Sequence, residues 1–470
     1  MWARRQLPLH ALSLFSATAP GAAAIAIVRL SGDTSIEIAE KCFRSRFGKK
    51  LSEQATHNVL LGDFYHQSTL LDEVLVSIFK NPNSYTGEDI VEISCHGSVY
   101  VQQQIVQTVQ DLGARLAEPG EFTLRAFLNK KMDLAQAEAV ADLIASESEA
   151  AHHIAVQHLR GGISTSLGQL RTRLLQFASL IELELDFSEE DVAFADRKQL
   201  NKLVADIRAT LKNLLDSFAT GNAIKNGIPV ALVGKPNAGK SSLLNALLDE
   251  EKALVSDIEG TTRDSIEDTL TIGGIQYRFI DTAGLRKTED TVEAMGVKRT
   301  QEKMDAASII LYVVDPQSQT PIETVGALKS MHREDATLLL VINKKDLLSK
   351  TAIENYGQAL SGLEVDKLVF STAYISTQSN ADIEQLKIHF SGQLEWNTGS
   401  ALVSNQRHWA ALQTAMKSIN EVALGIKENR SSDLLAIDIR QTLHELGTIT
   451  GEVTTEDILG NIFTNFCIGK

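Results

Sequence analysis

The sequence is poor in cysteine and proline, has no excess of positive charge, and contains no long apolar run. Its 470 residues include 3 cysteines, Cys42, Cys95 and Cys467, and no Cys-x-x-Cys pair. A disulfide framework or a cysteine zinc site is therefore not expected, and a reducing compartment fits better. No apolar run reaches the ~20 residues of a membrane span, so we expect no membrane partner. The net charge of −15, from 45 basic and 60 acidic residues, argues against a protein that coats nucleic acid over its whole surface.

Proline placement divides the chain. The 8 prolines lie within residues 8–119 and 229–321, with none between or after these regions. The first region mixes the apolar runs Val74–Phe79 and Ile90–Ser94 with turn signals such as N-P-N-S-Y-T-G, which predicts an α+β domain. Arg4 and Arg5, with no acidic residue before Asp33, fit either a transit-peptide stub or an irregular lead into a first strand at residues 22–30. We favour the lead into a strand.

Two stretches have helical spacing and are rich in Ala, Leu and Glu, from about Leu134 to Thr220 and from about Leu402 to Phe466. The sequence between them has a different pattern. Strand-like apolar runs occur there at Ile228–Val233, Tyr277–Ile280, Ser308–Val314, Thr337–Ile342 and Leu368–Phe370, separated by helix-compatible segments. This alternation predicts a mostly parallel sheet with covering helices.

The strongest motif is G-K-P-N-A-G-K-S, Gly234–Ser241, directly after the first of these runs. It matches G-x-x-x-x-G-K-[ST] between a strand and a helix. Glycines let backbone N–H groups wrap phosphate oxygens, and the following helix presents its positive amino end. Lys240 supplies a point charge for the β- and γ-phosphates, and Ser241 supplies a ligand for Mg²⁺. The flanking strand and helix argue against a chance glycine turn.

Two later motifs, each at a strand end, complete a nucleotide site. D-T-A-G, Asp281–Gly284, offers a carboxylate for the magnesium shell and an N–H for a γ-phosphate. N-K-K-D, Asn343–Asp346, offers a carboxylate that accepts two hydrogen bonds from guanine, and adenine lacks that pair of donors. A buried carboxylate left unpaired by the wrong base is costly, so we predict GTP rather than ATP. S-T-A-Y, with its register at Ser371 or Thr372, is the expected fourth loop against the base.

E-G-T-T-R-D, Glu259–Asp264, lies where a GTPase places its first switch. The hydroxyls of Thr261 and Thr262 are candidates for Mg²⁺ or the γ-phosphate. No glutamine follows D-T-A-G, so the attacking water needs another orienting residue. Glu293 is a candidate, although a solvated helix face explains that residue better when its position is considered alone.

Taken together, these residues resemble the MnmE family, also called TrmE, of GTPases that modify the wobble uridine of tRNA. The resemblance covers nearly the whole chain and rests on G-K-P-N-A-G-K-S-S-L-L-N, D-I-E-G-T-T-R-D, D-T-A-G-L-R, the inserted position of the GTPase segment and the C-terminal C-I-G-K. Y-T-G-E-D, C-H-G, P-G-E-F-T-L-R-A-F-L-N-K-K-M-D-L-A-Q-A-E-A and L-D-F-S-E-E-D also look like the family's pattern.

The resemblance implies a multidomain α/β fold. An α+β tetrahydrofolate-binding and dimerisation domain would span residues 1–127. A discontinuous α-helical domain would span residues 128–222 and 393–470. A Ras-like P-loop G domain with a parallel sheet, residues 223–392, would be inserted between its two parts.

The resemblance also implies that two G domains approach across a homodimer when GTP and K⁺ are bound. K⁺ would meet Asn237, Ser256, Ile258 and Thr261, in place of an arginine finger. Mg²⁺ would meet Ser241, Thr262 and, through water, Asp281, and Glu293 would orient the attacking water. The residues expected to bind GTP are Asn237, Ala238, Gly239, Lys240, Ser241, Ser242, Ser256, Thr261, Thr262, Asp281, Thr282, Ala283, Gly284, Asn343, Lys344, Asp346, Ser371, Thr372 and Ala373.

The implied folate site comprises Arg29, Glu92, Lys131 and the terminal Lys470, and would bind 5,10-methylene- or 5-formyl-tetrahydrofolate. In a heterotetramer with MnmG, an FAD-dependent subunit, the family adds an aminomethyl-type group (carboxymethylaminomethyl) to carbon 5 of the wobble uridine of tRNA. The FAD would sit on that partner, and the added carbon would come from the folate. Cys467 would lie close to the transferred carbon, as a nucleophile or as part of the pocket wall. The Ile-Gly-Lys that follows it does not suit prenylation.

Other interpretations stay open at this point. A ribosome-assembly GTPase, a switch without carbon-transfer chemistry, shares G-x-P-N-x-G-K-S and D-T-A-G, but we find no dedicated RNA-binding domain. A lipid-anchored signalling GTPase conflicts with the tail. We expect bacterial cytoplasm, with the mitochondrial matrix as the alternative. The spacing of His152, His153 and His158 predicts a helix surface, and the acidic cluster Glu189–Asp191 predicts a linker or structural feature.

Overall fold

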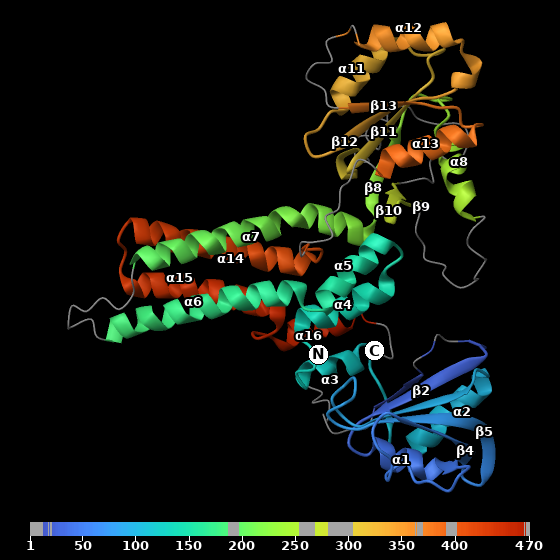
Figure 1. The fold of residues 1–470 in the computed structure, drawn as a ribbon, viewed down its shortest axis with the longest axis vertical. Helices are drawn as coiled ribbons and strands as arrows, with labels where there is room; N and C mark the ends of the chain where they lie inside the picture. Colours follow the sequence, from blue (N-terminus) through green and yellow to red (C-terminus); the bar gives the residue numbers. More distant parts are fainter. Residues whose placement is uncertain are drawn as a thin grey trace. The chain divides into compact units, whose positions relative to one another are not determined.

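The computed structural model describes residues 13–16, 18, 21–186, 197–252, 268–280, 304–361, 363, 370–391, 402–464 and 466. These residues form two compact units (Figure 1). The first unit comprises the described parts of Met1–Ala145, Ala155–Asn213 and Ala410–Lys470. The second comprises the described parts of Ser146–Ile154 and Leu214–Trp409. Within the part of the chain that is described, no helix is long and apolar enough to cross a membrane.

A 7-stranded sheet, in the order β3-β4-β5-β6-β2-β1-β7, begins the first unit. Its strands are β1 (Ser13–Ser16), β2 (Ile25–Ser31), β3 (Phe43–Ser45), β4 (Asn58–His66), β5 (Thr69–Phe79), β6 (Ile90–His96) and β7 (Arg115–Leu116). Helices α1 (Ser35–Cys42) and α2 (Val99–Asp111) pack against it. Ala26, Val28 and Leu30 of β2 are buried while Ile25 is exposed, because side chains alternate between the faces of a sheet.

The sheet confirms the predicted α+β character, with one addition. The expected first strand is β2, but β1 precedes it and pairs antiparallel with it, Ser13 opposite Ser31. The sequence of β1, S-L-F-S, has only 4 residues. So short a segment shows too few alternations to be recognised from its pattern.

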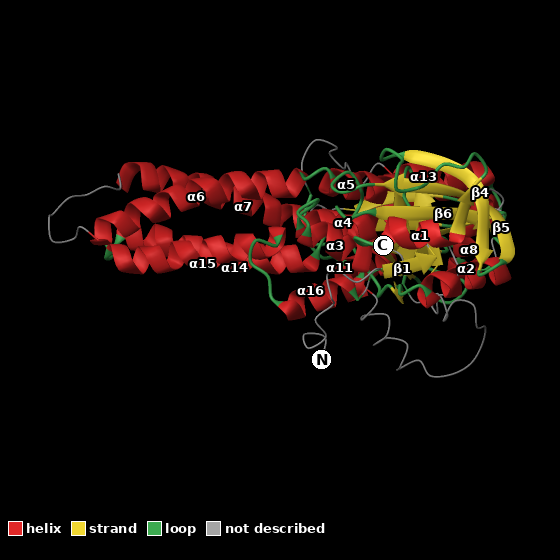
Figure 2. Ribbon diagram, turned by 90° about the horizontal axis from the view of Figure 1, so that it is seen from below, coloured by secondary structure: helices red, strands yellow, loops and turns green. Residues whose placement is uncertain are grey.

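The two helical stretches that are far apart in the sequence meet in the first unit. Helix α6 (Gly162–Asp186) packs against α15 (Ser432–Thr450) and α4 (Leu134–Ala145). Figure 2 shows α6 and α15 as long helices that run alongside one another. The remaining helices of these stretches are α5 (Glu149–Leu159), α7 (Arg197–Asn226), α14 (Gln406–Lys427) and α16 (Glu456–Phe463), and the short helix α3 (Glu121–Leu128) precedes them. The prediction of long helices in both stretches is confirmed.

His158 corrects the expectation of an exposed histidine group. His152 is exposed on α5, but His158 is buried, with 4% of its surface accessible. His158 lies four residues after Ile154 and so shares the buried face of the helix with it. The cluster Glu189–Asp191 lies outside the described residues.

A 6-stranded sheet in the order β13-β12-β11-β8-β10-β9 forms the centre of the second unit. Its strands are β8 (Ile228–Val233), β9 (Asp268–Ile272), β10 (Ile275–Phe279), β11 (Ile309–Val314), β12 (Thr337–Ile342) and β13 (Phe370–Tyr374). Neighbouring strands are parallel, except that β9 is antiparallel to β10. All six residues of β11 are buried, as expected for a parallel strand covered on both faces.

Helices cover both faces of this sheet. Leu243 and Leu247 of α8 (Lys240–Lys252) and Ile383 and Leu386 of α13 (Asn380–Ser391) belong to one apolar cluster. A second cluster contains Val325 of α11 (Pro321–Met331) and Leu360 of α12 (Lys350–Ser361). A short 3-10 helix, η3 (Lys345–Leu347), follows β12. The predicted layered α/β architecture of this segment is confirmed.

Two strands of this sheet differ from their predictions. The antiparallel edge strand β9 has a buried apolar side chain only at Leu270 and Ile272, which is too weak an alternation to predict a strand. The last strand, expected at Leu368–Phe370, is Phe370–Tyr374. Its residues are only partly buried, so it lacks the continuous apolar run that identified β11 and β12.

Candidate functional site

The loop Gly234–Ser241 joins β8 to α8 at the carboxyl edge of the sheet. Gly234 and Gly239 have positive φ angles of +154° and +96°, which favour glycine, and Asn237 has φ +61°. A Cβ on Gly234 would lie 2.2 Å from the carbonyl oxygen of Val313 in β11. The loop therefore passes close to the neighbouring strand, and only glycine permits that approach. Strand order reverses around β8, and such a crevice is where open α/β sheets bind ligands.

Lys240 curls back over this loop. Its Nζ donates to the carbonyl oxygens of Gly234 and Lys235, both at 2.8 Å. The ammonium group is thus held over the curve of the loop, beside its backbone. Ser241 and Ser242 are exposed in the first turn of α8. The positive end of a helix dipole, an ammonium and exposed serine residues together suit a polyphosphate with a bound divalent cation.

Asn343 connects this loop to the end of β12. It is buried, with 1% of its surface accessible, and its Nδ2 donates to the Ala238 carbonyl oxygen at 3.0 Å. Among the described residues, its Oδ1 is buried without a hydrogen-bond partner. A buried acceptor of this kind is costly unless a bound group donates to it. Lys344 and Asp346 follow at the same edge of the sheet, and the Lys344 Nζ pairs with Asp315 at 2.7 Å.

A second loop, after β13, is tied to this one. The Lys345 N–H donates to the Ile375 carbonyl oxygen at 3.1 Å. Asp382 accepts from the Ser376 N–H at 2.8 Å and pairs with the Lys345 ammonium at 2.5 Å. Asp382 is buried at 5% exposure, so this charge is held by its two partners. Ser376 and Thr377 therefore lie beside the Asn343–Asp346 loop.

This geometry corrects the position of the fourth loop. Ser371, Thr372 and Ala373 lie within β13, where Ser371 pairs with Leu339 in the body of β12. Ser371 also lines a cavity with Thr337, the first residue of β12, away from the carboxyl edge. The Ser-Thr pair recurs at Ser376 and Thr377. Only the register of β13 against β12 distinguishes the two pairs, and the sequence does not contain that register.

The other predicted residues of the G domain lie outside the described residues. These are Ser256, Ile258, Thr261, Thr262, Asp281, Thr282, Ala283, Gly284 and Glu293. The tail residues Cys467 and Lys470 also lie outside them.

In the first unit, Arg29 and Glu92 face one another on neighbouring strands β2 and β6. The Arg29 Nη2 lies 2.6 Å from Glu92 Oε1, and Arg29 Nε donates to the same oxygen at 2.8 Å. The Arg29 guanidinium also lies over the Phe122 ring, 5.7 Å from its centroid. The Tyr85 hydroxyl bonds to Thr123 at 2.9 Å, and burial raises the pKa of this phenol. A cation, a carboxylate and aromatic rings are thereby brought together.

A buried ionic network lies beside the cluster of Arg29, Glu92 and the aromatic rings. Arg125 donates to Glu88 at 2.8 Å and to Glu121 at 2.7 Å. Although burial would raise the pKa of Glu121, hydrogen bonds from Arg115, the Glu118 N–H and Arg125 hold it below its usual value. Glu88 also accepts from the Ser31 hydroxyl at 2.9 Å. The network fixes α3 and the segment before β6 against β2.

Lys131 and the start of the C-terminal tail lie at the two ends of α3. Lys131 follows this helix, and the tail packs on Gly120 in front of it. Lys131 Nζ donates to the Pro82 carbonyl oxygen at 2.8 Å and packs beside Gly87. Gly120, with φ +68°, precedes α3, and a Cβ there would lie 2.6 Å from the Phe463 carbonyl oxygen and 3.0 Å from the Phe466 Cβ. Phe466 is thus held against Gly120, which lies two residues before Phe122 in the sequence. This close packing brings the beginning of the tail to the α3 end that faces Arg29.

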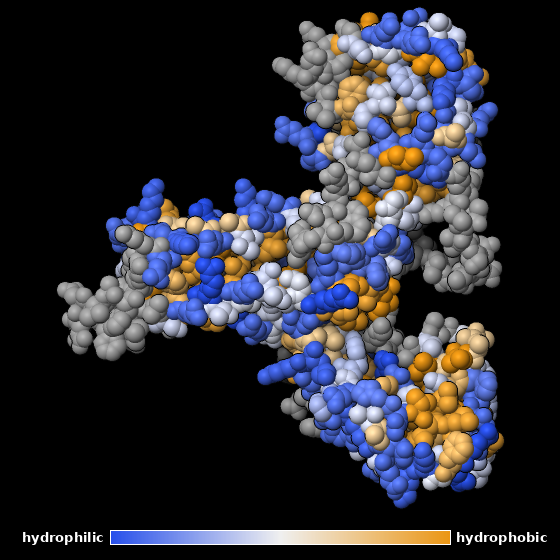
Figure 3. Space-filling view, in the orientation of Figure 1, coloured by the Kyte–Doolittle hydropathy of each residue, from blue (hydrophilic) through white to orange (hydrophobic). Residues whose placement is uncertain are grey.

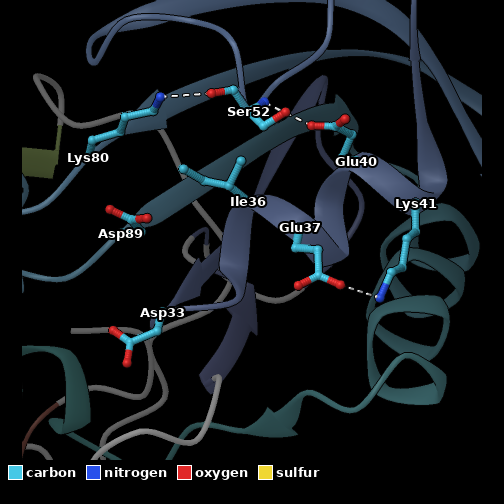
Figure 4. Close-up of a pocket in the computed structure, with 8 residues that line it drawn as sticks. All are labelled: Asp33, Ile36, Glu37, Glu40, Lys41, Ser52, Lys80 and Asp89. Carbon is cyan, nitrogen blue, oxygen red and sulfur yellow. Dashed lines mark hydrogen bonds and ion pairs between the residues drawn. The ribbon is translucent and has the colours of Figure 1, made fainter.

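A separate cavity of about 630 Å³ lies beside α1. Its lining residues are Asp33, Ile36, Glu37, Glu40, Lys41, Ser52, Lys80 and Asp89 (Figure 4). Lys41 is paired with Glu37 at 2.8 Å, and Lys80 donates to the Ser52 carbonyl oxygen at 2.9 Å. With four carboxylates against two ammonium groups, it does not suit a polyanionic folate tail, and it contains none of the predicted folate residues.

Comparison with known proteins finds matches for both the N-terminal part of the chain and the part that contains the Gly234–Ser241 loop. A family model for the N-terminus of the GTP-binding protein TrmE matches residues 14–131. A model for the MnmE helical domain matches residues 134–467, which enclose the parallel sheet. The tRNA modification GTPase MnmE of Flavobacterium johnsoniae is 52% identical over 462 residues, covering 97% of this chain and 98% of that protein. The protein of the same name from Christiangramia forsetii is 51% identical over 469 residues, with the same coverage. The chain therefore belongs to the MnmE family of tRNA modification GTPases.

Proposed function

We propose that this protein hydrolyses GTP as part of a tRNA-modifying complex. The observation that carries the GTP site is the contact between the phosphate loop and the base loop, through Asn343 and Ala238. This contact supports a site for phosphates beside a site for a base at one edge of one sheet. The relatives named above are tRNA modification GTPases, which supports the tRNA substrate.

The loop Asn237–Ser242 holds the phosphates, with Lys240 on the β- and γ-phosphates. Asp346 accepts from guanine, and Asn343 holds the two loops together. Ser376 and Thr377 replace Ser371, Thr372 and Ala373 as the residues that close on the base, and Lys344 flanks it. Thr282, Ala283 and Gly284, after Asp281, complete the γ-phosphate side.

Two cations fit these residues. Ser241, Thr262 and, through water, Asp281 hold Mg²⁺, which when bound neutralises the charge on the phosphates. Asn237, Ser256, Ile258 and Thr261 hold K⁺, and hydrolysis is accordingly K⁺-dependent and coupled to pairing of two G domains. The exposed Ser241 hydroxyl and the left-handed backbone at Asn237 are the described features that support these assignments. Glu293 orients the attacking water.

The second site binds a tetrahydrofolate that supplies the added carbon. Arg29 and Lys131 are cations for its glutamate tail, Glu92 is a carboxylate for its pterin edge, and Phe122 is an aromatic surface. Lys470 and Cys467 complete this site from the tail, whose start packs at Gly120. Cys467 is assigned a role in the chemistry without a covalent step.

The chain acts as a homodimer, and with MnmG, which carries FAD, as a heterotetramer on tRNA. Apolar side chains gather on the first unit (Figure 3). Ile25 is 63% exposed and Leu75 46% exposed. Ile25 shares a face of β2 with Arg29, because alternate residues point the same way. A second copy that covers this face would lie beside the folate residues. The bacterial relatives support a bacterial cytoplasmic location.

Purified protein tests the nucleotide assignment. With K⁺ and Mg²⁺ present, we expect hydrolysis of GTP and not of ATP. Asp346→Asn is expected to lose GTP hydrolysis by weakening GTP binding at least about tenfold, since the carboxylate acceptor is gone. Equal hydrolysis of ATP and GTP by the wild type would sink the assignment.

A further inference from the structure

The β9–β10 hairpin lies between the two chain segments that contain most of the predicted Mg²⁺ and γ-phosphate residues. It joins residues 253–267 to residues 281–300, and these two segments contain Thr261, Thr262, Asp281 and Glu293. Its turn is formed by Gly273 and Gly274, both with positive φ. Whatever holds this hairpin in place therefore acts at one end of each segment to which the proposed function assigns residues for Mg²⁺ and the γ-phosphate.

The turn is bonded to the start of α5. The Ala150 N–H donates to the Gly274 carbonyl oxygen at 3.0 Å. Glu149 packs directly on this glycine, since a Cβ there would lie 3.0 Å from Glu149 Oε2. Figure 1 shows β10 next to the beginning of α5. The φ of +78° favours glycine at position 274, and a side chain there would press on Glu149.

A side chain of β10 makes a second connection. Gln276 Nε2 donates to Glu147 Oε2 at 2.8 Å, across 129 residues of sequence. A Cβ on Gly227, which lies between α7 and β8, would be 3.2 Å from Gln276 Oε1. Gln276 thus lies between the entry to α5 and the link from α7 to the sheet.

Apolar packing reinforces both connections. Ala150 and Ile154 of α5 and Ile224 of α7 are buried in the same cluster as Ile272 and Ile275 of the hairpin. From Ala155 onward, the residues of α5 belong to the first unit. Helix α5 is thus shared by the unit that contains the phosphate loop and the unit that contains the Arg29–Glu92 pair.

From these contacts we propose that Gln276 and Gly274 are positioning residues that couple the state of the nucleotide to helix α5. This inference rests on the proposed GTPase function and extends it. A change in either segment beside the hairpin alters the register of the hairpin, which in turn alters the bonds at Glu147 and Ala150. The first turn of α5 is the element that responds.

Hydrogen exchange on the full chain tests this coupling. We expect the peptide spanning residues 147–154 to exchange about threefold or more differently with GDP and with a non-hydrolysable GTP analogue, because that factor corresponds to one hydrogen bond gained or lost. Gln276→Glu places two carboxylates together and should abolish this difference. The double variant Glu147→Gln, Gln276→Glu restores a donor facing an acceptor and should recover it.

Controls separate coupling from stability. Thr269→Ala changes an exposed residue on the same hairpin, and the nucleotide-dependent difference should persist. GTP affinity in Gln276→Glu should stay within about twofold of the wild type, as for a substitution outside the nucleotide site. Identical exchange in both nucleotide states of the wild type would overturn the inference while leaving the GTPase function intact. A difference that survives Gln276→Glu would also overturn it. Absence of GTP binding would remove the proposed function and the inference together.

Discussion

Gly239 and Asn343 are in direct contact, although 104 positions separate them in the sequence. A Cβ on Gly239 would lie 2.1 Å from the Asn343 Nδ2. The same Nδ2 donates to Ala238. The loops Gly234–Ser241 and Asn343–Asp346 therefore meet at a buried contact, which leaves no room for a side chain at position 239.

Gly239→Ala should displace Asn343 and weaken GTP binding. The new methyl group cannot fit at 2.1 Å, and the φ of +96° disfavours any side chain. We expect at least about a tenfold rise in the Kd of a fluorescent GTP analogue, because the Asn343–Ala238 bond is lost. Gly326→Ala is the matched control, since nothing lies within 4 Å of its Cβ. Unchanged GTP affinity in Gly239→Ala would show that the contact between Gly239 and Asn343 does not support GTP binding.

The ionic network around Glu121 predicts acid sensitivity. The pKa of Glu121 is lowered in the folded state, so its stabilisation is present above the ordinary carboxyl value of about 4.3 and is lost as the pH falls through the lowered value. Glu121→Gln should cost about 3 kcal/mol at pH 7, because it leaves the buried Arg125 and the partly buried Arg115 without their shared carboxylate. The cost should shrink below pH 4. Urea unfolding at pH 7 and at lower pH measures both effects.

Glu53→Gln is the control for this prediction, because the pair of Glu53 with Lys50 is exposed and 3.5 Å long. Exposed pairs contribute little, so its unfolding free energy should change by less than about 1 kcal/mol at either pH. A Glu121→Gln variant with the same pH dependence as the wild type would contradict the account.

Arg29→Met should weaken binding of 5-formyl-tetrahydrofolate by about tenfold or more, since an ionic hydrogen-bonding group is lost and the length of the side chain is kept. Calorimetry on the full chain measures this affinity. Arg44→Met is a matched control, because Arg44 also lies over a ring, Tyr65, but on β3, at the far edge of the sheet order from β2. GTP hydrolysis should be retained in both variants. Equal folate affinity in the two variants would remove Arg29 from the site.

The buried thiols of Cys42 and Cys95 should react slowly with alkylating reagents in the folded protein. Burial raises the pKa of Cys42 to about 12 and that of Cys95 to about 11. Almost no thiolate is present on either residue at pH 7, and both are buried. We expect alkylation of the native Cys467→Ser variant, which retains only these two thiols, to be very slow. Labelling of the same variant in urea should reveal both. Fast native labelling of Cys42 would contradict the burial of α1.

The sequence predicted elements best where burial on two faces leaves a continuous apolar run. Ile228–Val233 and Thr337–Ile342 were predicted at the bounds that the structure has. It failed where the element is short or at an edge, as for β1 and β9. Register was also hidden, because the pairing of Ser371 with Leu339 depends on a strand 32 positions away.

The candidate sites divide in the same way. The phosphate loop could be predicted because the spacing of its glycines, lysine and serine is what brings them to a phosphate group. The roles of Ser376 and Asp382 depend on contacts between distant segments, and so does the Gln276–Glu147 bond. Arg29 and Glu92 were identified through the family resemblance, and the structure adds that they face one another across β2 and β6.

Modification of the wobble uridine of tRNA is the reaction to which we propose that GTP hydrolysis is tied. The decisive experiment is nucleoside mass spectrometry of tRNA from cells that lack the gene, with wild type, Asp281→Ala and Cys467→Ser restored separately. We expect loss of the 5-substituted wobble uridine, with recovery by the wild type alone. An unchanged wobble base in cells without the gene would contradict the proposed function and favour a ribosome-assembly GTPase.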